Sequence, residues 1–166
     1  NKHLRPQPIS IIKAEEVSTE FHARFSAKQR HYKYKIINRR SPLTLDKDFA
    51  WVIHKELDIK SMQEASKFFI GKHNFNAFRS INCQSESSIK TIDDVLITME
   101  KNSINMNFRA KSFLHSQVRI MVGTLVYIGE GKIEFKDIQS LIQSGERQNA
   151  GPTAPANGLY LTEVIY

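Results

Sequence analysis

The chain has 166 residues, 40% of them hydrophobic and 25% charged, with a formal net charge of +7 and a sequence pI of about 9.5. This length suits a single domain, residues 1–166, that buries a core without disulfides or a structural metal. The single cysteine excludes an intrachain disulfide within these residues and favours a reducing compartment, so we expect a cytoplasmic protein. No apolar run approaches the roughly 20 residues of a transmembrane helix, and the basic balance favours nucleic acid or an anionic membrane surface as partner.

Two strands are predicted in the first part of the chain. Residues 9–21 indicate a strand of mixed burial. Residues 31–37 give a clearer pattern, because Tyr32, Tyr34 and Ile36 fall on one face and basic residues on the other.

A helix is predicted over residues 57–70, where apolar residues recur at helical spacing. Asp58 or Ser61 can cap its start, and Gly71 is expected to end it.

The second half of the chain begins with a predicted hairpin and continues with helices. Alternating apolar residues at 91–100 and 103–110 indicate two strands joined by a turn at 101–102. Helical spacing returns at 115–128 and again, more briefly, at 135–144.

A loop rich in Pro, Gly and Ala is predicted over residues 148–157, followed by a final strand at 159–166. Strand pairs stand beside helices in this order of elements. The sequence therefore predicts an α+β fold, with a largely antiparallel sheet and helices packed on one face.

Residues 21–34 interleave four cations with four aromatic side chains. Cations hold phosphates, and aromatic faces stack on bases with roughly 1–3 kcal/mol each. The same pattern fits a strand with a buried aromatic face and a solvated basic face, so it does not decide between the two.

Arg119 interrupts the apolar stripe of the helix at 115–128. A buried arginine needs a partner, which can be a carboxylate, a phosphate or solvent at the helix edge. His115 and Gln117 lie where the helix begins, and their position favours capping over catalysis. The loop at 148–157 can be a pocket wall or a plain connection, and Cys83 has the surroundings of a buried bystander thiol.

Several stretches, taken together and in this order, resemble the TruA family of tRNA pseudouridine synthases and span nearly the whole chain. They are FHARFSA (21–27), YKY (32–34), GKHNF with FR (71–75 and 78–79), FLH (113–115), QVR with MVG (117–123) and AGPTAPANGLYL (150–161).

The resemblance implies the pseudouridine synthase fold and the isomerisation of uridine in the anticodon stem-loop of tRNA, with no organic cofactor and no metal. It implies that Tyr32 packs on the uracil and helps move the proton from C5, that Arg119 pairs with a catalytic aspartate, and that Leu159 lines the uracil pocket. It also implies a homodimer for the full-length protein. Further candidate RNA contacts are Arg24, Lys28, Arg30, Arg79, His115 and Gln117.

The chain departs from the family at the nucleophile, because the family's aspartate belongs to a Gly-Arg-Thr-Asp-x-Gly-Val-His-Ala block upstream of the first matching stretch. None of the six aspartates here follows Arg-Thr: Asp46, Asp48, Asp58, Asp93, Asp94 and Asp137. We therefore expect a C-terminal portion that lacks the catalytic segment and the N-terminal half-domain, and that is inactive by itself.

Two other functions fit the composition. A non-catalytic RNA-binding module would use the basic and aromatic strand without chemistry, and it would gain support if Tyr32, Arg119 and Leu159 lay far apart. A membrane-surface protein is disfavoured by the absence of a basic amphipathic helix from the sequence pattern. For the synthase portion we expect Arg119 to hold a sulfate, a phosphate or water in place of its aspartate, and not to contact apolar groups alone. We also expect the sheet to have an unpaired edge or a hydrophobic patch.

Overall fold

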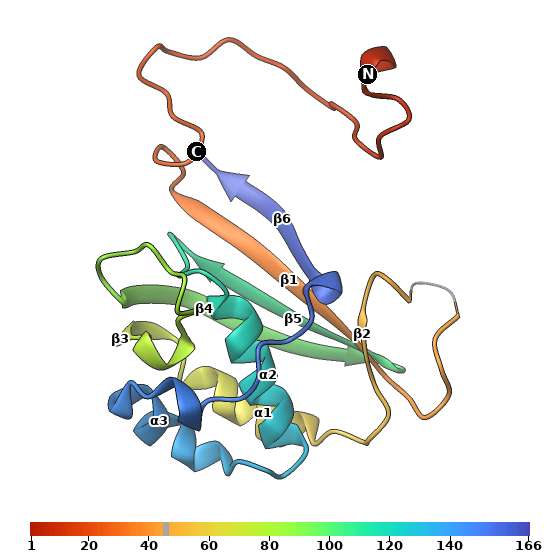
Figure 1. The fold of residues 1–166 in the computed structure, drawn as a ribbon, viewed down its shortest axis with the longest axis vertical. Coiled ribbons are helices and arrows are strands. Elements are labelled where there is room, and N and C mark those ends of the chain that lie inside the picture. The colour runs from red at the N-terminus through yellow and green to blue at the C-terminus, as the bar shows by residue number, and fades with distance from the viewer. Residues whose placement is uncertain (45–46) are drawn as a thin grey trace.

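Among the described residues, six strands join into one sheet (Figure 1). The computed structural model describes residues 1–44 and 47–166, so Asp46 lies outside the described residues. The strands are β1 (Gln29–Asn38), β2 (Trp51–Ile53), β3 (Gly71–Asn74), β4 (Ile89–Glu100), β5 (Ser103–Ala110) and β6 (Leu159–Ile165).

Strand β1 lies one strand in from the β2 and β6 side of the sheet and has partners on both sides. The order is β2-β1-β5-β4-β3, and β6 also pairs with β1. On the side away from β5, residues 29–34 of β1 pair with β6 and residues 36–38 pair with β2. All pairings except β1 with β2 are antiparallel, which confirms the predicted largely antiparallel sheet.

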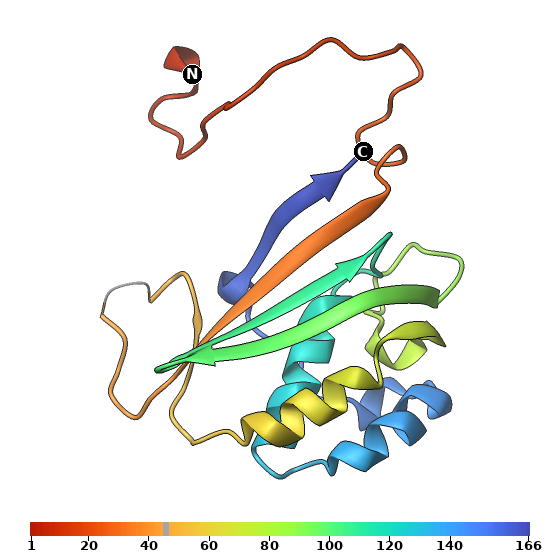
Figure 2. The same ribbon diagram turned by 180° about the vertical axis from the view of Figure 1, so that it is seen from behind.

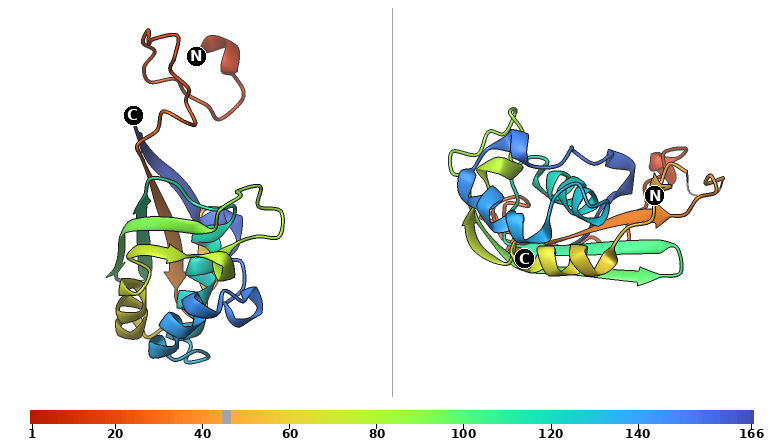
Figure 3. Two further views of the ribbon diagram at one scale, coloured as in Figure 1. Left: turned by 90° about the vertical axis from the view of Figure 1, so that its left-hand side faces the viewer. Right: turned by 90° about the horizontal axis from the view of Figure 1, so that it is seen from below.

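Three α-helices cover one face of the sheet in the described part of the chain, as the views in Figures 2 and 3 show. They are α1 (Ile59–Lys67), α2 (Gln117–Gly129) and α3 (Ile138–Ser144). The α+β fold class is thereby confirmed. In the described residues, no helix has the length and apolar character needed to cross a bilayer.

The core forms where the inner face of the sheet meets α2. Tyr34 and Ile36 of β1 are fully buried, as their alternation predicted, and so are Met106 and Phe108 of β5. Nearly every side chain of α2 is buried as well. A helix that is apolar on almost all sides is buried in a core, and α2 accordingly packs against the elements around it on nearly every side.

Helix α1 is capped by Asp58, whose carboxylate accepts the backbone N–H of Ser61 at 3.1 Å. The amide Nε2 of Gln63 donates to the carbonyl of Ile97 in β4 at 2.9 Å, so the helix also protects the part of β4 that β3 does not pair. The sequence predicted that Gly71 ends this helix, but the helix ends earlier, at Lys67. With a φ of +106°, Gly71 makes the turn into β3.

The hairpin of β4 and β5 has the predicted arms and turn, with Lys101 in the left-handed conformation at φ +53°. The helix predicted at 135–144 is a 3₁₀ turn over Phe135–Asp137 followed by α3. Short strands β2 and β3 were not predicted, because three or four residues are too few to show an alternation.

The strand predicted at residues 9–21 is wrong. The segment has no strand, and it runs away from the body of the molecule (Figures 1 and 3). Ile12 is 97% exposed, and Ile9, Ile11 and Val17 are exposed too. A strand needs a neighbouring strand for its backbone groups, and no strand of the described residues pairs with this segment.

One edge of the sheet is open. The outer side of β6 pairs with no other strand of the described residues. Leu161 and Tyr166 are exposed beside it. The unpaired edge expected from the sequence is therefore present.

Candidate active site

A cavity of about 400 Å³ opens beside the first half of β1, where the start of α2 and the start of β6 meet. Tyr32, Arg119 and Leu159 all line it, and these are the three residues to which the family resemblance assigned roles at the active site. Its other lining residues are Arg24, Arg30, Ser112, Phe113, Leu114, His115, Ser116, Gln117 and Val118. We call this cavity the uridine pocket, after the ligand that the sequence predicts.

Tyr32 stands on the inner face of β1, where Arg30 and Tyr34 also point because side chains alternate along a strand. Its ring meets the edge of Phe113 with centroids 5.3 Å apart and an interplanar angle of 85°. On the β6 side the ladder skips Thr162 between the partners of His31 and Tyr32. Such a bulge often re-aims a side chain beside a functional site.

Arg119 lies in the first turn of α2 and is partly buried. Its Nε donates to the carbonyl of Ala154 at 2.6 Å, and the N–H of Ala154 donates to the carbonyl of Arg119 at 3.1 Å. This double contact gives the guanidinium a backbone partner, and the occupation of its free side by an anion or water stays a prediction. The two Nη groups have no acceptor among the described residues, so the guanidinium can still receive an anion.

Tyr34 lies close enough to feel this charge. Burial raises the pKa of its hydroxyl, and the positive charge of Arg119 opposes part of that rise. The hydroxyl donates to the carbonyl of Pro155 at 2.6 Å. Tyr34 and Arg119 thus hold neighbouring carbonyls of one loop, and Tyr34 stays neutral beside the charged guanidinium.

The loop at 150–155 is fixed to α2 by close backbone packing. The N–H of Gly151 donates to the buried hydroxyl of Thr124 at 2.9 Å. A Cβ at Gly123 would lie 1.8 Å from the carbonyl oxygen of Pro152, so only glycine allows this approach. The sequence left open whether this loop walls a pocket. Residues 150–155 do not line the uridine pocket, but through Ala154 they position Arg119, which does.

Gln117 and His115 differ in their roles at the start of α2. Gln117 is fully buried, and its Oε1 accepts the backbone N–H of Leu114 at 2.8 Å, which stabilises the turn that leads into the helix. Its Nε2 is buried without a partner. The side chain of His115 is exposed and makes no hydrogen bond to the described residues, whereas its N–H donates to the sulfur of Cys83 at 3.4 Å.

The predicted cations divide into those at the pocket and those away from it. Arg30 donates to the carbonyls of Arg24 and Lys111, so it ties the turn before β1 to the loop after β5. Lys28 and Arg79 do not line the pocket. Lys28 is exposed near the end of β6, and Arg79 donates to the carbonyl of Cys83 at 3.0 Å.

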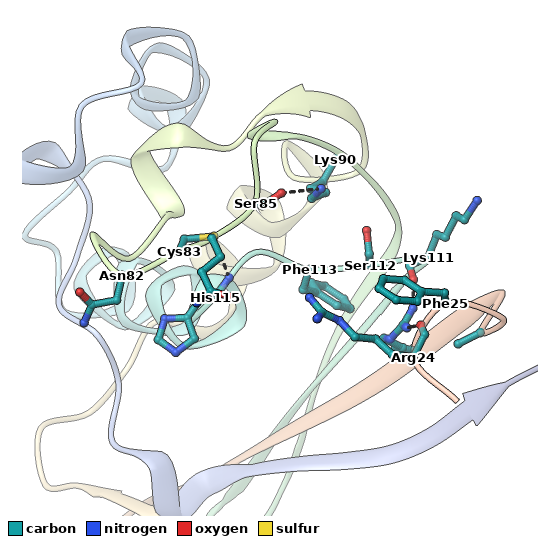
Figure 4. Close-up of a pocket in the computed structure, with 13 residues that line it drawn as sticks. Arg24, Phe25, Asn82, Cys83, Ser85, Lys90, Lys111, Ser112, Phe113 and His115 are labelled. Atoms are coloured by element: carbon teal, nitrogen blue, oxygen red, sulfur yellow. Dashed lines mark hydrogen bonds between the residues drawn. The ribbon is translucent and has the colours of Figure 1, made fainter. Parts of the chain in front are cut away.

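The sequence missed Lys90 and Lys111, which line a second cavity that adjoins the uridine pocket (Figure 4). Each stands outside the matching stretches, and one lysine on a strand or loop carries no signal of its own. Cys83 is buried, as its surroundings indicated, and it lies in the wall of this second cavity.

Comparison with known proteins shows the family to which the chain is similar. A family model described as tRNA pseudouridine synthase matches residues 65–166. Proteins named tRNA pseudouridine synthase A align over all 166 residues and over 68% of their own length. Those from Anaplasma phagocytophilum and Ehrlichia chaffeensis are 49% identical, and the one from Parvibaculum lavamentivorans is 46% identical.

Proposed function

Because this chain belongs to the tRNA pseudouridine synthase family of isomerases, we propose that the uridine pocket receives a uridine flipped out of a tRNA anticodon stem-loop. The main support is that Tyr32, Arg119 and Leu159, from three elements far apart in the chain, line one cavity. A volume of about 400 Å³ is within the range of small-ligand sites.

The reaction breaks the bond between uracil N1 and the ribose C1′, turns the base, and joins C1′ to C5. The C5 proton leaves and N1 gains one, so the product is an isomer of the substrate. We assign Tyr32 to the face of the uracil, where its hydroxyl can help move the C5 proton. We assign Leu159 to the apolar wall that holds the base while it turns.

Arg119 is assigned to the catalytic aspartate, the nucleophile that the family uses. The contact with Ala154 fixes the direction of the guanidinium. The Nη groups can then bind a carboxylate through two hydrogen bonds, and the positive charge keeps that carboxylate ionised. The arginine is therefore a positioning residue that acts through the nucleophile.

We further propose that residues 1–166 do not isomerise uridine by themselves, because the printed sequence contains no Gly-Arg-Thr-Asp block. The open edge of β6 and the exposed apolar side chains beside it support docking of further protein, including a second copy in a homodimer. The tRNA substrate and the single cysteine support a cytoplasmic location.

The test compares residues 1–166 with the full-length enzyme on a tRNA transcript, with pseudouridine mapped by chemical labelling and primer extension. We expect product in the anticodon arm from the full-length enzyme and none from residues 1–166. Arg119→Gln and Tyr32→Phe in the full-length enzyme should lower turnover by about 100-fold or more, while RNA binding changes little.

Product from residues 1–166 alone would contradict the proposed need for the aspartate segment. Modification confined to another arm of the tRNA would contradict the assignment of substrate. A full-length protein that binds the hairpin without forming product would favour the RNA-binding module.

A further inference from the structure

The second cavity is larger than the uridine pocket, with a volume of about 730 Å³. Figure 4 shows its two walls, one formed by the loop at 82–85 and one by the turn at 24–25 with the loop at 111–113. The two cavities share Arg24, Arg30, Ser112, Phe113 and His115. They are therefore neighbouring compartments of one groove, and we call the larger one the flanking pocket.

The flanking pocket is strongly basic. Arg24, Arg30, Lys90 and Lys111 line it, and among the described residues no carboxylate does. Arg30 is already bound to two backbone carbonyls, but the guanidinium of Arg24 has no acceptor in the described part of the chain. The ammonium of Lys90 has only the hydroxyl of Ser85, at 3.3 Å. Three cations of the described residues, Arg24, Lys90 and Lys111, are thus available for an anion.

The pKa of the Cys83 thiol is consistent with the positive charge that lines this pocket. Burial raises the pKa of its thiol, but the backbone N–H groups of Ser85 and His115 and the charges of Arg79 and Lys90 outweigh that effect, so the pKa is lowered. The wall of the pocket therefore favours negative charge even on a partly desolvated sulfur.

The remaining lining is suited to a nucleotide. Phe25 is 72% exposed at the rim, and the guanidinium of Arg24 lies over its ring, 5.3 Å from the centroid. Exposed amide side chains of Asn82 and Gln84 stand on the opposite wall. In proteins that bind single-stranded RNA, aromatic side chains stack on the bases and cations bind the phosphates. Amide side chains form hydrogen bonds with the base edges.

We propose that the flanking pocket binds the nucleotide next to the target uridine in the RNA chain, with its phosphate between Arg24 and Lys90. This inference depends on the proposed function. A flipped nucleotide leaves its stack, so the adjoining backbone must be held for the base to stay in the uridine pocket. The shared wall at Phe113 and Arg24 lets one RNA strand pass from one compartment to the other. Lys111, whose amine extends outward in Figure 4, lies where that strand leaves the groove.

The first test uses Lys90→Gln in the full-length enzyme, with Lys136→Gln as control because Lys136 is exposed and lines neither pocket. The dissociation constant of an anticodon stem-loop is measured against salt concentration. Each phosphate contact contributes roughly 0.7 to 0.9 to the slope of log K against log salt. Lys90→Gln should lower the slope by about that amount, and Lys136→Gln should leave it unchanged.

A second test reads occupancy directly. In a Cys83→Ser background, Gln84→Cys is labelled with a maleimide in the presence and absence of the hairpin, and Gln139→Cys, also exposed, is the control. Bound RNA should slow labelling at position 84 several-fold and leave position 139 unaffected. Inorganic phosphate at the same phosphate concentration should protect far less, because it lacks the rest of the strand.

These outcomes separate the two proposals. If the wild type forms pseudouridine while Lys90→Gln keeps the wild-type salt slope and position 84 stays unprotected, only the flanking pocket is overturned. If inorganic phosphate protects position 84 as well as the hairpin does, the pocket is a free-anion site and the inference fails. If the wild type neither binds nor modifies the hairpin, both proposals fail.

Discussion

The substitution Gly123→Ala should disturb the site from a distance. An ideal Cβ at this position lies 1.8 Å from the carbonyl oxygen of Pro152 and 2.9 Å from its carbon. A carbon–oxygen contact of roughly 3.3 Å is tolerable, so the loop must retreat by about 1.5 Å. The carbonyl of Ala154 that holds Arg119 belongs to the same loop and should move with it.

Two effects set the size of the stability change. Overpacking of a core costs about 1–3 kcal/mol, whereas alanine in place of glycine within a helix gains about 1 kcal/mol. We expect the free energy of unfolding, measured by urea denaturation, to fall by at most about 2 kcal/mol. Turnover of the full-length enzyme on a saturating hairpin should fall by about 100-fold, because a misplacement of about 1 Å at a reacting centre has that effect.

Gly129→Ala in the same helix is the matched control. Its Cβ meets the Sδ atom of Met62 at 2.6 Å and the Cβ of Leu57 at 3.3 Å, and it does not touch the loop. The flexible methionine can move, so turnover should stay near the wild-type value. If Gly123→Ala kept both wild-type stability and wild-type turnover, the loop would not be the positioning element that we describe.

Three smaller changes test other parts of the fold. Tyr34→Phe removes the hydrogen bond to the Pro155 carbonyl and should lower the free energy of unfolding by about 1 kcal/mol, read from urea midpoints. Thr124→Val leaves the buried N–H of Gly151 unpaired and should lower it by about 1–3 kcal/mol in the same assay. Hydrogen bonds from the first turn of α1 lower the pKa of Asp58, so its cap stabilises the fold above the ordinary aspartate pKa. The difference in urea midpoint between wild type and Asp58→Ala should therefore shrink as pH falls from 7 to about 2.5, and a constant difference would contradict the assignment.

Long periodic segments were predicted well because burial on one side imposes a visible pattern. The hairpin of β4 and β5, the long strand β1 and helix α2 all follow their alternation or helical spacing. The segment at 9–21 shows the limit of this approach, since its apolar residues favour a strand but no partner strand among the described residues pairs with them. The three-residue strand β2 could not be predicted from the sequence. Its position depends on pairing with β1 and not on a pattern in its own residues.

The site was predictable where residues stand in distinctive blocks. Tyr32, Arg119 and Leu159 were identified through the resemblance and lie in one pocket. The acceptor of Arg119 could not be predicted, because the carbonyl of Ala154 is presented by backbone geometry and not by residue type. Lys90 reaches the groove only because β4 folds beside the loop at 82–85.

The position of β6 beside β1 has a consequence for how the molecule folds. The hydrogen bond from Tyr34 to Pro155 joins residues 121 positions apart, and the β1–β6 ladder spans a similar separation. Contacts this distant carry a large loop-closure entropy and tend to form late in folding. The wall with Leu159 should therefore be absent from early intermediates that already contain the local β4–β5 hairpin. The proposed competence to bind a uridine would then arise at the end of folding, and a newly made chain would gain the proposed site only after the β1–β6 ladder forms.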